Sequence, residues 1–403
     1  MLILTCVRSA TSPHRTGLRR TALRRTAALA ILAIAAGALT ACSNASAQPP
    51  ANLISVSNGG CGSTWQVPHP GPYTFRIYNA AAEAGEVDLV NPATSGVYAE
   101  VEDLGPGTTA PMYLDMGSGR YAFRCLFDDY DPITGVTETV PGHVSGSPAT
   151  LPVTNNDLLE PAKEYHAYAQ AGLTTLAAQT ATLSSDVQAG NLAQARTDWL
   201  TAHLTYERLG AAYDAFGNFD QEIDGRPDGL AGGVNSKQWT GFYRLEYGLW
   251  HGQSVTELKP AAATLNADVD ALLKSWPPTE INLLLIGLRT HEILENALEF
   301  QLTGHDDYGS GTVLATVLAN ITGTRELLQV LNPLLAARYA QLPAVTTWLD
   351  RLQSLIQKYG YQNGRWSPVT SLSTSIRQQI DAACDQALVE LAPIAAITEP
   401  RST

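Results

Sequence analysis

The chain has 403 residues, of which 38 are acidic and 25 are lysine or arginine, so its formal net charge is −13 at pH 7. A surface of this sign repels nucleic acid and anionic lipid headgroups and attracts cations, which argues against nucleic-acid binding. The length is sufficient for two domains.

The first 41 residues have the composition of a secretory signal. Six arginines and no acidic residues accompany an apolar run over residues 27–38, which is shorter than the roughly 20 residues of a membrane span. The run leads into Leu39-Thr40-Ala41-Cys42, which resembles a bacterial lipobox. We therefore predict cleavage before Cys42, lipidation of its thiol and a flexible tether over residues 42–50. The predicted location is the outer face of the cytoplasmic membrane or the periplasmic cell envelope.

Two alternatives stay open at this end of the chain. An uncleaved anchor helix with a chance cysteine is one, and export by a twin-arginine route rather than the general route is the other. Cleavage would remove six arginines and leave 19 basic against 38 acidic residues, a formal charge of −19. The mature chain would then favour cations more strongly than the precursor.

Residues 51–145 have the pattern of β structure. Short segments of strand composition are separated by glycine, proline and asparagine, which predicts an antiparallel β-sandwich. The segments are 72–78, 97–101, 112–116 and 121–125. The last of them resembles the late strand of a cupredoxin, so we expect a cupredoxin-like domain.

A blue-copper site is disfavoured in this region. Such a site needs two histidines, a cysteine and usually a weak methionine, but the region holds only His69 and His143, and no histidine closely follows Cys125. In an oxidising compartment Cys125 is better used in a disulfide with Cys61. A loop of that length stabilises by roughly 3–4 kcal/mol if the bond is unstrained.

Beyond a linker over residues 146–156, the chain becomes helical in character over 157–395 and ends in a short tail over 396–403. Alanine, leucine, glutamine and glutamate dominate, with apolar residues at helical spacing. The pattern predicts one or two bundles of antiparallel helices. The predicted helices cover residues 158–188, 192–216, 238–251, 264–274, 280–302, 312–331, 333–357 and 370–392.

Three polar clusters in the helical region contain candidate metal ligands. His203 and Glu207 are four residues apart and share a helix face. The break that follows their helix, residues 218–229, has four carboxylates in nine residues, Asp220 and Asp224 among them, and Tyr243 and Glu246 share a face of the next helix.

If those two helices pack antiparallel, Glu207, Asp224, Tyr243 and Glu246 converge, with Asp220 and His203 as further candidates. Such hard oxygen donors suit Fe³⁺, Ca²⁺ or Mn²⁺ better than Zn²⁺ or Cu⁺. The alternative is a set of ion pairs and solvated acidic residues without a metal.

Three segments, in order, resemble the imelysin family, and within it the EfeO-type branch of envelope lipoproteins that serve bacterial iron uptake. The segments are Tyr206-Glu207-Arg208-Leu209, residues 223–228 and residues 241–250. The order of lipobox, cupredoxin-like domain and helical domain also matches that branch, and the resemblance covers roughly residues 50–395. It implies a protein that binds iron, ferric or ferrous, or another divalent metal. It also implies delivery to a membrane iron permease, with a secreted haem peroxidase as a second partner.

The family's metal region is a Gly-x-His-x-x-Glu motif with carboxylates from the preceding helix and loop. Glu207, Asp224 and Glu246 match it, but Tyr243 stands where the motif has histidine, and Gly210 stands where some members have a second glutamate. Two outcomes stay open. Tyr243 supplies a phenolate to a ferric ion, or the site is weakened or lost.

Two other functions compete with the iron carrier. A metallopeptidase needs a metal with an open position and a general base, yet the motif lacks its histidine, and His291-Glu292-Ile293-Leu294-Glu295 has glutamate where a zincin has its second histidine. The third function is a scaffold lipoprotein with a degenerate metal site. In the β region, acidic residues could form a second, weaker metal site, drawn from Glu83, Glu86, Glu100, Glu102 and Asp103.

Overall fold

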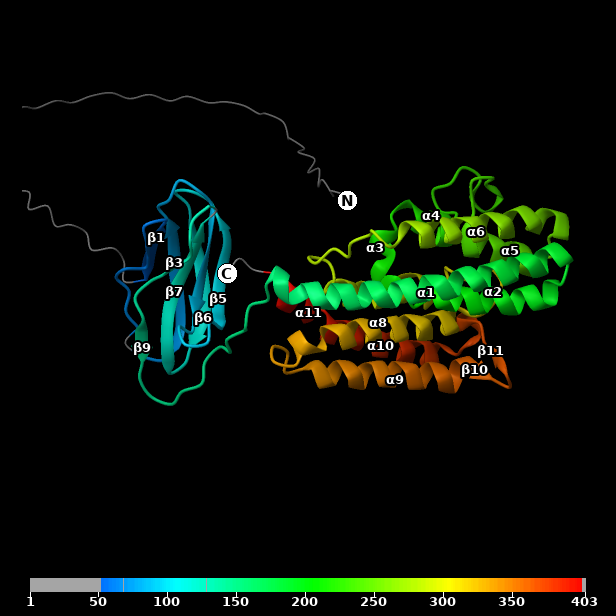
Figure 1. Cartoon of the computed structure of the whole chain (residues 1–403). Helices are drawn as coiled ribbons and strands as arrows, with labels where there is room; N and C mark the ends of the chain where they lie inside the picture. The colour runs from blue at the N-terminus through cyan, green and yellow to red at the C-terminus, as the bar shows by residue number, and fades with distance from the viewer. Residues whose placement is uncertain (1–51, 68, 128, 401–403) are drawn as a thin grey trace, which may run out of the picture. The chain divides into compact units, whose positions relative to one another are not determined.

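The computed structural model describes residues 52–67, 69–127 and 129–400. The predicted signal segment, the tether and Cys42 lie outside these residues. Strands dominate the first part of the described chain and helices the second, as Figure 1 shows. One short hairpin, β10 (Tyr361–Gln362) and β11 (Arg365–Trp366), lies within the helical part. The predicted order of a β region followed by an all-helical region is therefore confirmed. No helix of the described residues has the length and hydrophobicity that a membrane crossing requires.

The β region consists of two sheets. The first has the strand order β2-β1-β3-β6 and the second β5-β4-β7-β8, with β9 paired to β7. The strands are β1 (Leu53–Ser57), β2 (Gly60–Cys61), β3 (Gly71–Asn79), β4 (Gly85–Val90), β5 (Val97–Leu104), β6 (Thr109–Met116), β7 (Gly119–Phe127), β8 (Ile133–Thr134) and β9 (Glu138–Val140). Neighbouring strands in these sheets run antiparallel except β1 and β3, which are parallel.

Alternation along the strands builds a common core from both sheets. In β3, Phe75 and Ile77 are buried while Arg76 between them is exposed, as expected where successive side chains point to opposite faces. Phe75 makes an edge contact with Phe123 of β7 in the other sheet, with ring centroids 5.4 Å apart. The β region therefore has a hydrophobic core of its own.

A disulfide joins the two sheets. Cys61 of β2 and Cys125 of β7 are both buried and are linked with an S–S distance of 2.03 Å and a Cα–Cα distance of 5.7 Å. The bond closes a loop of 64 residues. The covalent link therefore connects the edge of the first sheet to a central strand of the second.

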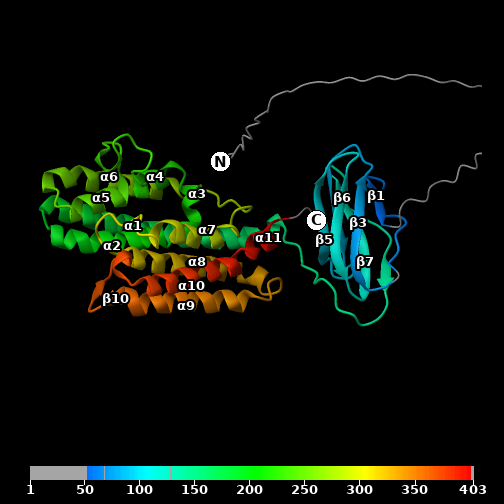
Figure 2. The ribbon, with the colours of Figure 1, turned by 180° about the vertical axis from the view of Figure 1, so that it is seen from behind.

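The helical region consists of long antiparallel helices with short elements between them. The helices are α1 (Asn155–Ala189), α2 (Leu192–Glu207), α3 (Tyr213–Phe216), α4 (Asn218–Asp224), α5 (Gly241–Trp250), α6 (Val255–Ser275), α7 (Arg289–Asn296), α8 (Val313–Leu335), α9 (Leu342–Gly360), α10 (Thr374–Leu391) and α11 (Pro393–Thr398). In Figures 1 and 2, α8, α9 and α10 lie on one side of α1 and α2, and α5 and α6 lie on the other. One hydrophobic core runs through this assembly.

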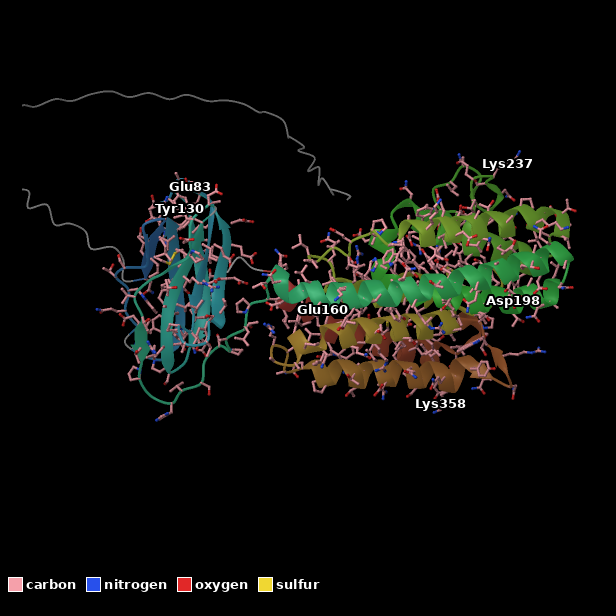
Figure 3. The ribbon with its side chains drawn as sticks, viewed as in Figure 1. Glu83, Tyr130, Glu160, Asp198, Lys237 and Lys358 are labelled. Atoms are coloured by element: carbon pink, nitrogen blue, oxygen red, sulfur yellow. A yellow bond between two sulfur atoms is a disulfide. The ribbon has the colours of Figure 1, made fainter. Side chains whose placement is uncertain are left out.

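Charged side chains cover the outside of both regions. Figure 3 shows Glu83 on the β region and Lys237 and Lys358 at the surface of the helical region. Both lysines are exposed. Lys358 belongs to α9, whose buried residues Val345, Leu349, Leu352 and Ile356 recur at helical spacing, as the amphipathic pattern predicts.

Several predicted helices differ in their bounds. The helix predicted over 192–216 ends at Glu207, and the chain then turns through a 3₁₀ segment, Gly210–Ala212, where Gly210 packs closely against Ile293. The acidic stretch predicted as a break contains α4. Pro333, expected to end a helix, lies inside α8. A proline removes one backbone hydrogen bond, and burial of Leu334 and Leu335 beside it offsets that loss.

Removal of the disulfide tests its contribution to stability. We expect the Cys61→Ala, Cys125→Ala double variant to lose roughly 3–4 kcal/mol of unfolding free energy, because the open loop regains chain entropy in the unfolded state. Urea unfolding of the chain measures the loss. A change below about 1 kcal/mol would show that the link does not constrain the unfolded chain. Cys384→Ala, at a free buried thiol, is the control for cysteine removal.

Candidate metal centre

The last two turns of α2 present an imidazole and a carboxylate to the protein interior. His203 and Glu207 are only 2% and 3% exposed. The ring of His203 is enclosed by those of Trp199, Phe242 and Tyr243, whose centroids lie 4.9, 5.2 and 5.3 Å away. Because the two residues are one turn apart, a single helix fixes both side chains.

The short helix α4 supplies a second carboxylate, Asp224, at its last residue. Contacts from the segment before α5 hold α4 in place. Thr240 Oγ1 donates to the Glu222 carbonyl at 2.8 Å, and Trp239 Nε1 donates to the Gly225 carbonyl at 2.9 Å. Gly241 is also required here, because its φ is +87° and a Cβ would lie 2.3 Å from the Ile223 carbonyl oxygen.

His203, Glu207 and Asp224, called the trio below, converge on one point. His203 Nε2 lies 3.0 Å from Glu207 Oε1 and 3.2 Å from Asp224 Oδ1, and one ligand atom from each residue lies within 4.8 Å of the others. Neither Nε2 nor Asp224 Oδ1 has a partner with hydrogen-bond geometry. Ligands at right angles on an ion with bonds of about 2.1 Å stand about 3.0 Å apart, so the two distances from His203 Nε2 match the spacing of cis ligands.

Without a metal, a proton on His203 balances the two carboxylates. Burial of the ring opposes protonation, but the charge of Asp224 and the close contacts with Asp224 and Glu207 outweigh it and raise the pKa of His203 to about 10. Burial also raises the pKa of Asp224 well above its usual value, and the charge of His203 opposes that effect. A cation that enters the trio therefore displaces a proton.

Tyr243 lies beside the trio with its hydroxyl directed elsewhere. The ring packs edge-on against His203, and the hydroxyl donates to Asp306 Oδ2 at 3.4 Å. Burial, followed by the charges of Asp224 and Glu207, raises the pKa of the Tyr243 phenol well above its usual value. The structure thus surrounds a neutral phenol with carboxylates.

Two other candidate ligands have different partners. Glu246 Oε1 accepts hydrogen bonds from the backbone N–H groups of Tyr308 at 3.1 Å and Ser310 at 2.9 Å, and burial raises its pKa to about 7. Asp220 accepts a hydrogen bond of 2.7 Å from the Tyr206 hydroxyl. The group of converging ligand atoms contains His203, Glu207 and Asp224 but not Glu246. Oε1 of Glu246 is bonded to the loop after α7, whereas its buried Oε2 has no hydrogen-bond partner among the described residues.

A polar cavity of about 660 Å³ opens beside the trio. Seven carboxylates and two guanidinium groups line it, so its field favours cations. The guanidinium groups are engaged: Arg226 pairs with Asp306 at 3.2 Å, and Arg289 with Asp214 at 3.4 Å. The charged lining residues are Glu207, Asp214, Asp220, Asp224, Arg226, Asp228, Arg289, Glu292 and Asp306.

Sequence reasoning missed four residues beside the candidate ligands: Arg226, Gln301, Asp306 and Asn320. Arg226 stands in the segment 223–228 that supports the family resemblance, and Asp306 is one of two adjacent aspartates, so inspection of their charges could have found them. Gln301 and Asn320 are neutral amides within helical segments, and the sequence gives no signal for their role.

A second acidic group lies in the β region. Glu86, Asp88 and Glu100 bring ligand atoms within 4.8 Å of one another. Asp88, which the sequence did not single out, is fully buried and pairs with Arg124 at 2.8 Å. Of the other acidic residues considered there, Glu102 and Asp103 are exposed.

Comparisons with known proteins confirm the family resemblance that the sequence segments indicated. The family model described as imelysin matches residues 161–402. The iron uptake system component EfeO of Yersinia pestis is 26% identical over 345 residues, which covers 81% of this chain and 89% of the relative. The component of the same name from Escherichia coli (strain K12) is 25% identical over 331 residues, with coverages of 79% and 84%.

The protonation of His203 is testable in the metal-free protein. Since its pKa rises from the usual 6.5 to about 10, we expect the ring to stay protonated throughout that interval. Its ¹H–¹⁵N imidazole signals, followed by NMR between pH 6 and 10.5, report the midpoint. Asp224→Asn removes the charge that most favours protonation, so it should lower the midpoint. A wild-type midpoint near 6.5 would contradict the expectation.

The close approach of α4 and α5 gives a second test. Gly241→Ala forces an unfavourable φ and a backbone clash, so we expect it to cost about 3 kcal/mol or more. Gly252→Ala is the matched control, because its φ is +72° and nothing lies within 4 Å of the added Cβ; it should cost about 1–2 kcal/mol. Urea unfolding compares them. Equal losses would show that α4 is free to move aside.

Proposed function

Since the family model matches more than half of its length, this chain belongs to the imelysin family, and we propose that it binds iron at the trio and serves an iron-uptake system of the cell envelope. The observation that supports this most directly is the convergence of one imidazole nitrogen and two carboxylate oxygens within 4.8 Å. The relatives named as iron uptake system components support the role.

The donor set fits a first-row metal such as iron. Imidazole nitrogen suits iron, zinc, copper and nickel, whereas carboxylate oxygen suits magnesium, calcium and manganese, so a mixed set favours metals that accept both. With a neutral His203, the trio has a charge of −2 from Glu207 and Asp224. His203 would thus supply, from α2, the imidazole that the family motif places at the position of Tyr243.

A carrier fits the surroundings better than a peptidase does. Hydrolysis requires a general base poised beside a metal-bound water. Glu246, the motif's glutamate, has Oε1 bonded to two backbone N–H groups and is not among the residues that line the cavity. The cavity gives an ion a wide polar path to the trio, which suits uptake and release.

The same proposal includes the membrane anchor, the domain order and the partner proteins. The chain would be anchored by lipid at Cys42 through a tether over 42–50, with a cupredoxin-like domain over 51–145, a linker over 146–156 and the iron-binding domain over 157–395. It would pass iron to a membrane permease and act beside a secreted haem peroxidase. The negative field of the cavity supports collection of a cation from dilute solution.

Metal titration of the chain from Ser43 onward tests the proposal. We expect one Fe²⁺ under anaerobic conditions, or one Fe³⁺, per chain. His203→Ala, Glu207→Gln and Asp224→Asn should each weaken binding at least about tenfold, since each removes a ligand or leaves a buried charge unbalanced. His143→Ala and Glu160→Gln, at exposed residues, are the controls. Absence of binding by the wild type, with Mn²⁺ included, would leave the scaffold function, whereas chelator-sensitive cleavage of a peptide library would favour the peptidase.

The same titration determines the role of Tyr243. Carboxylates surround its neutral phenol, so we expect no phenolate-to-Fe³⁺ band in visible absorption, and we expect Tyr243→Phe to keep the binding stoichiometry. A band that disappears in Tyr243→Phe would make the phenolate a ligand and contradict this expectation.

A further inference from the structure

The two oxygens of Glu207 have different partners. Oε1 faces His203 Nε2 at 3.0 Å, whereas Oε2 accepts a hydrogen bond from Gln301 Nε2 at 3.4 Å. Gln301 Oε1 in turn accepts a hydrogen bond from Asn320 Nδ2 at 2.9 Å. Gln301 and Asn320 are 5% and 3% exposed. Two buried amides therefore stand in series behind one ligand oxygen.

Unusual backbone features place both amides there. Gln301 ends a π-helical segment, Ala297–Gln301, in which the Leu302 N–H donates to the Ala297 carbonyl at 2.8 Å. Such turns are rare and often occur at functional sites. On α8, Gly323 lies one turn after Asn320, and a Cβ there would lie 2.5 Å from the Arg208 carbonyl oxygen. This close approach of α8 to the end of α2 brings Asn320 near Glu207.

The donor and acceptor groups fix the orientation of the Gln301 and Asn320 amides. An ionised carboxylate accepts hydrogen bonds and donates none, so Gln301 must present its NH₂ group to Glu207. Its carbonyl oxygen then points away, and Asn320 donates to it. Asn320 therefore selects the amide orientation that Glu207 needs.

We propose that Gln301 and Asn320 are positioning residues that hold Glu207 as a one-oxygen metal ligand and thereby set the metal preference of the trio. This inference rests on the proposed function. With Oε2 held by Gln301, only Oε1 faces the ion. Ca²⁺ takes six to eight oxygens, often with a bidentate carboxylate, so a Glu207 restricted to one oxygen disfavours Ca²⁺ relative to a transition metal.

Two near-isosteric variants of the mature chain test the pair, with Mn²⁺ and Ca²⁺ as probes. Gln301→Met removes the donor to Glu207. Asn320→Asp removes the donor to Gln301 and attracts its NH₂ group, which turns the amide oxygen toward Glu207. We expect each to weaken Mn²⁺ binding about 10–100-fold, the range for outer-shell partners of metal ligands, and to weaken Ca²⁺ binding less. The Ca²⁺-to-Mn²⁺ ratio of dissociation constants should therefore fall.

The double variant tests whether the amides act in series. Asn320 acts through Gln301, so Asn320→Asp should add little to Gln301→Met. Asn266→Asp, which adds a charge on α6 away from the cavity lining, is the matched control and should leave both constants unchanged. Calorimetric unfolding of each metal-free variant checks that the fold is intact.

The outcomes separate the two proposals. If the wild type binds no metal, the proposed function fails. If it binds metal at the trio but Gln301→Met and Asn320→Asp keep both dissociation constants, the positioning role of Gln301 and Asn320 is overturned and the proposed function stands. Equal losses of Mn²⁺ and Ca²⁺ affinity would overturn the role in metal preference.

Discussion

Two carboxylates and an imidazole buried within 4.8 Å of one another impose the main constraint on the helical region. Closely spaced carboxylates with little access to water are costly without a cation or proton beside them, so a positive charge next to Glu207 and Asp224 stabilises the group. In the metal-free protein the proton of His203 supplies it. The same arrangement that stabilises an imidazolium also suits a metal ion, and the competition between proton and metal follows from this geometry.

Hydrogen bonds and ion pairs distinguish the three proposed ligands from the other acidic residues near them. Asp220, Asp306 and Glu246 have other partners, namely the Tyr206 hydroxyl, Arg226 and the backbone of residues 308–310. The trio is left with two carboxylates of its own, while the remaining acidic residues make the cavity negative. Under the proposed function, a cation would be attracted by many charges and held by few, which would suit both uptake and release.

The sequence was sufficient for the architecture and for part of the site. Short segments of strand composition predicted the β region, and apolar residues at helical spacing predicted the long helices. The face shared by His203 and Glu207 was predictable because a single helix determines it. The sequence could not predict which side chains pair between segments that are distant along the chain. Glu246 Oε1, for example, accepts hydrogen bonds from backbone N–H groups more than sixty residues away in the chain. Helix α4 resembled a loop because its acidic residues and flanking glycines are typical of turns.

The position of the imidazole has structural consequences for the trio. At the position of Tyr243 the imidazole would belong to α5. His203 instead shares α2 with Glu207, so one helix fixes two of the three proposed ligands. Only Asp224 depends on a separate element, the seven-residue helix α4. Such a short helix has little stability of its own. Contacts from Trp239, Thr240 and Gly241 to α4 and the residue after it therefore hold Asp224 in place. Tyr243, at the motif position, and His203, on α2, also depend on each other structurally. The ring of Tyr243 packs against the imidazole of His203 and helps to fix its position.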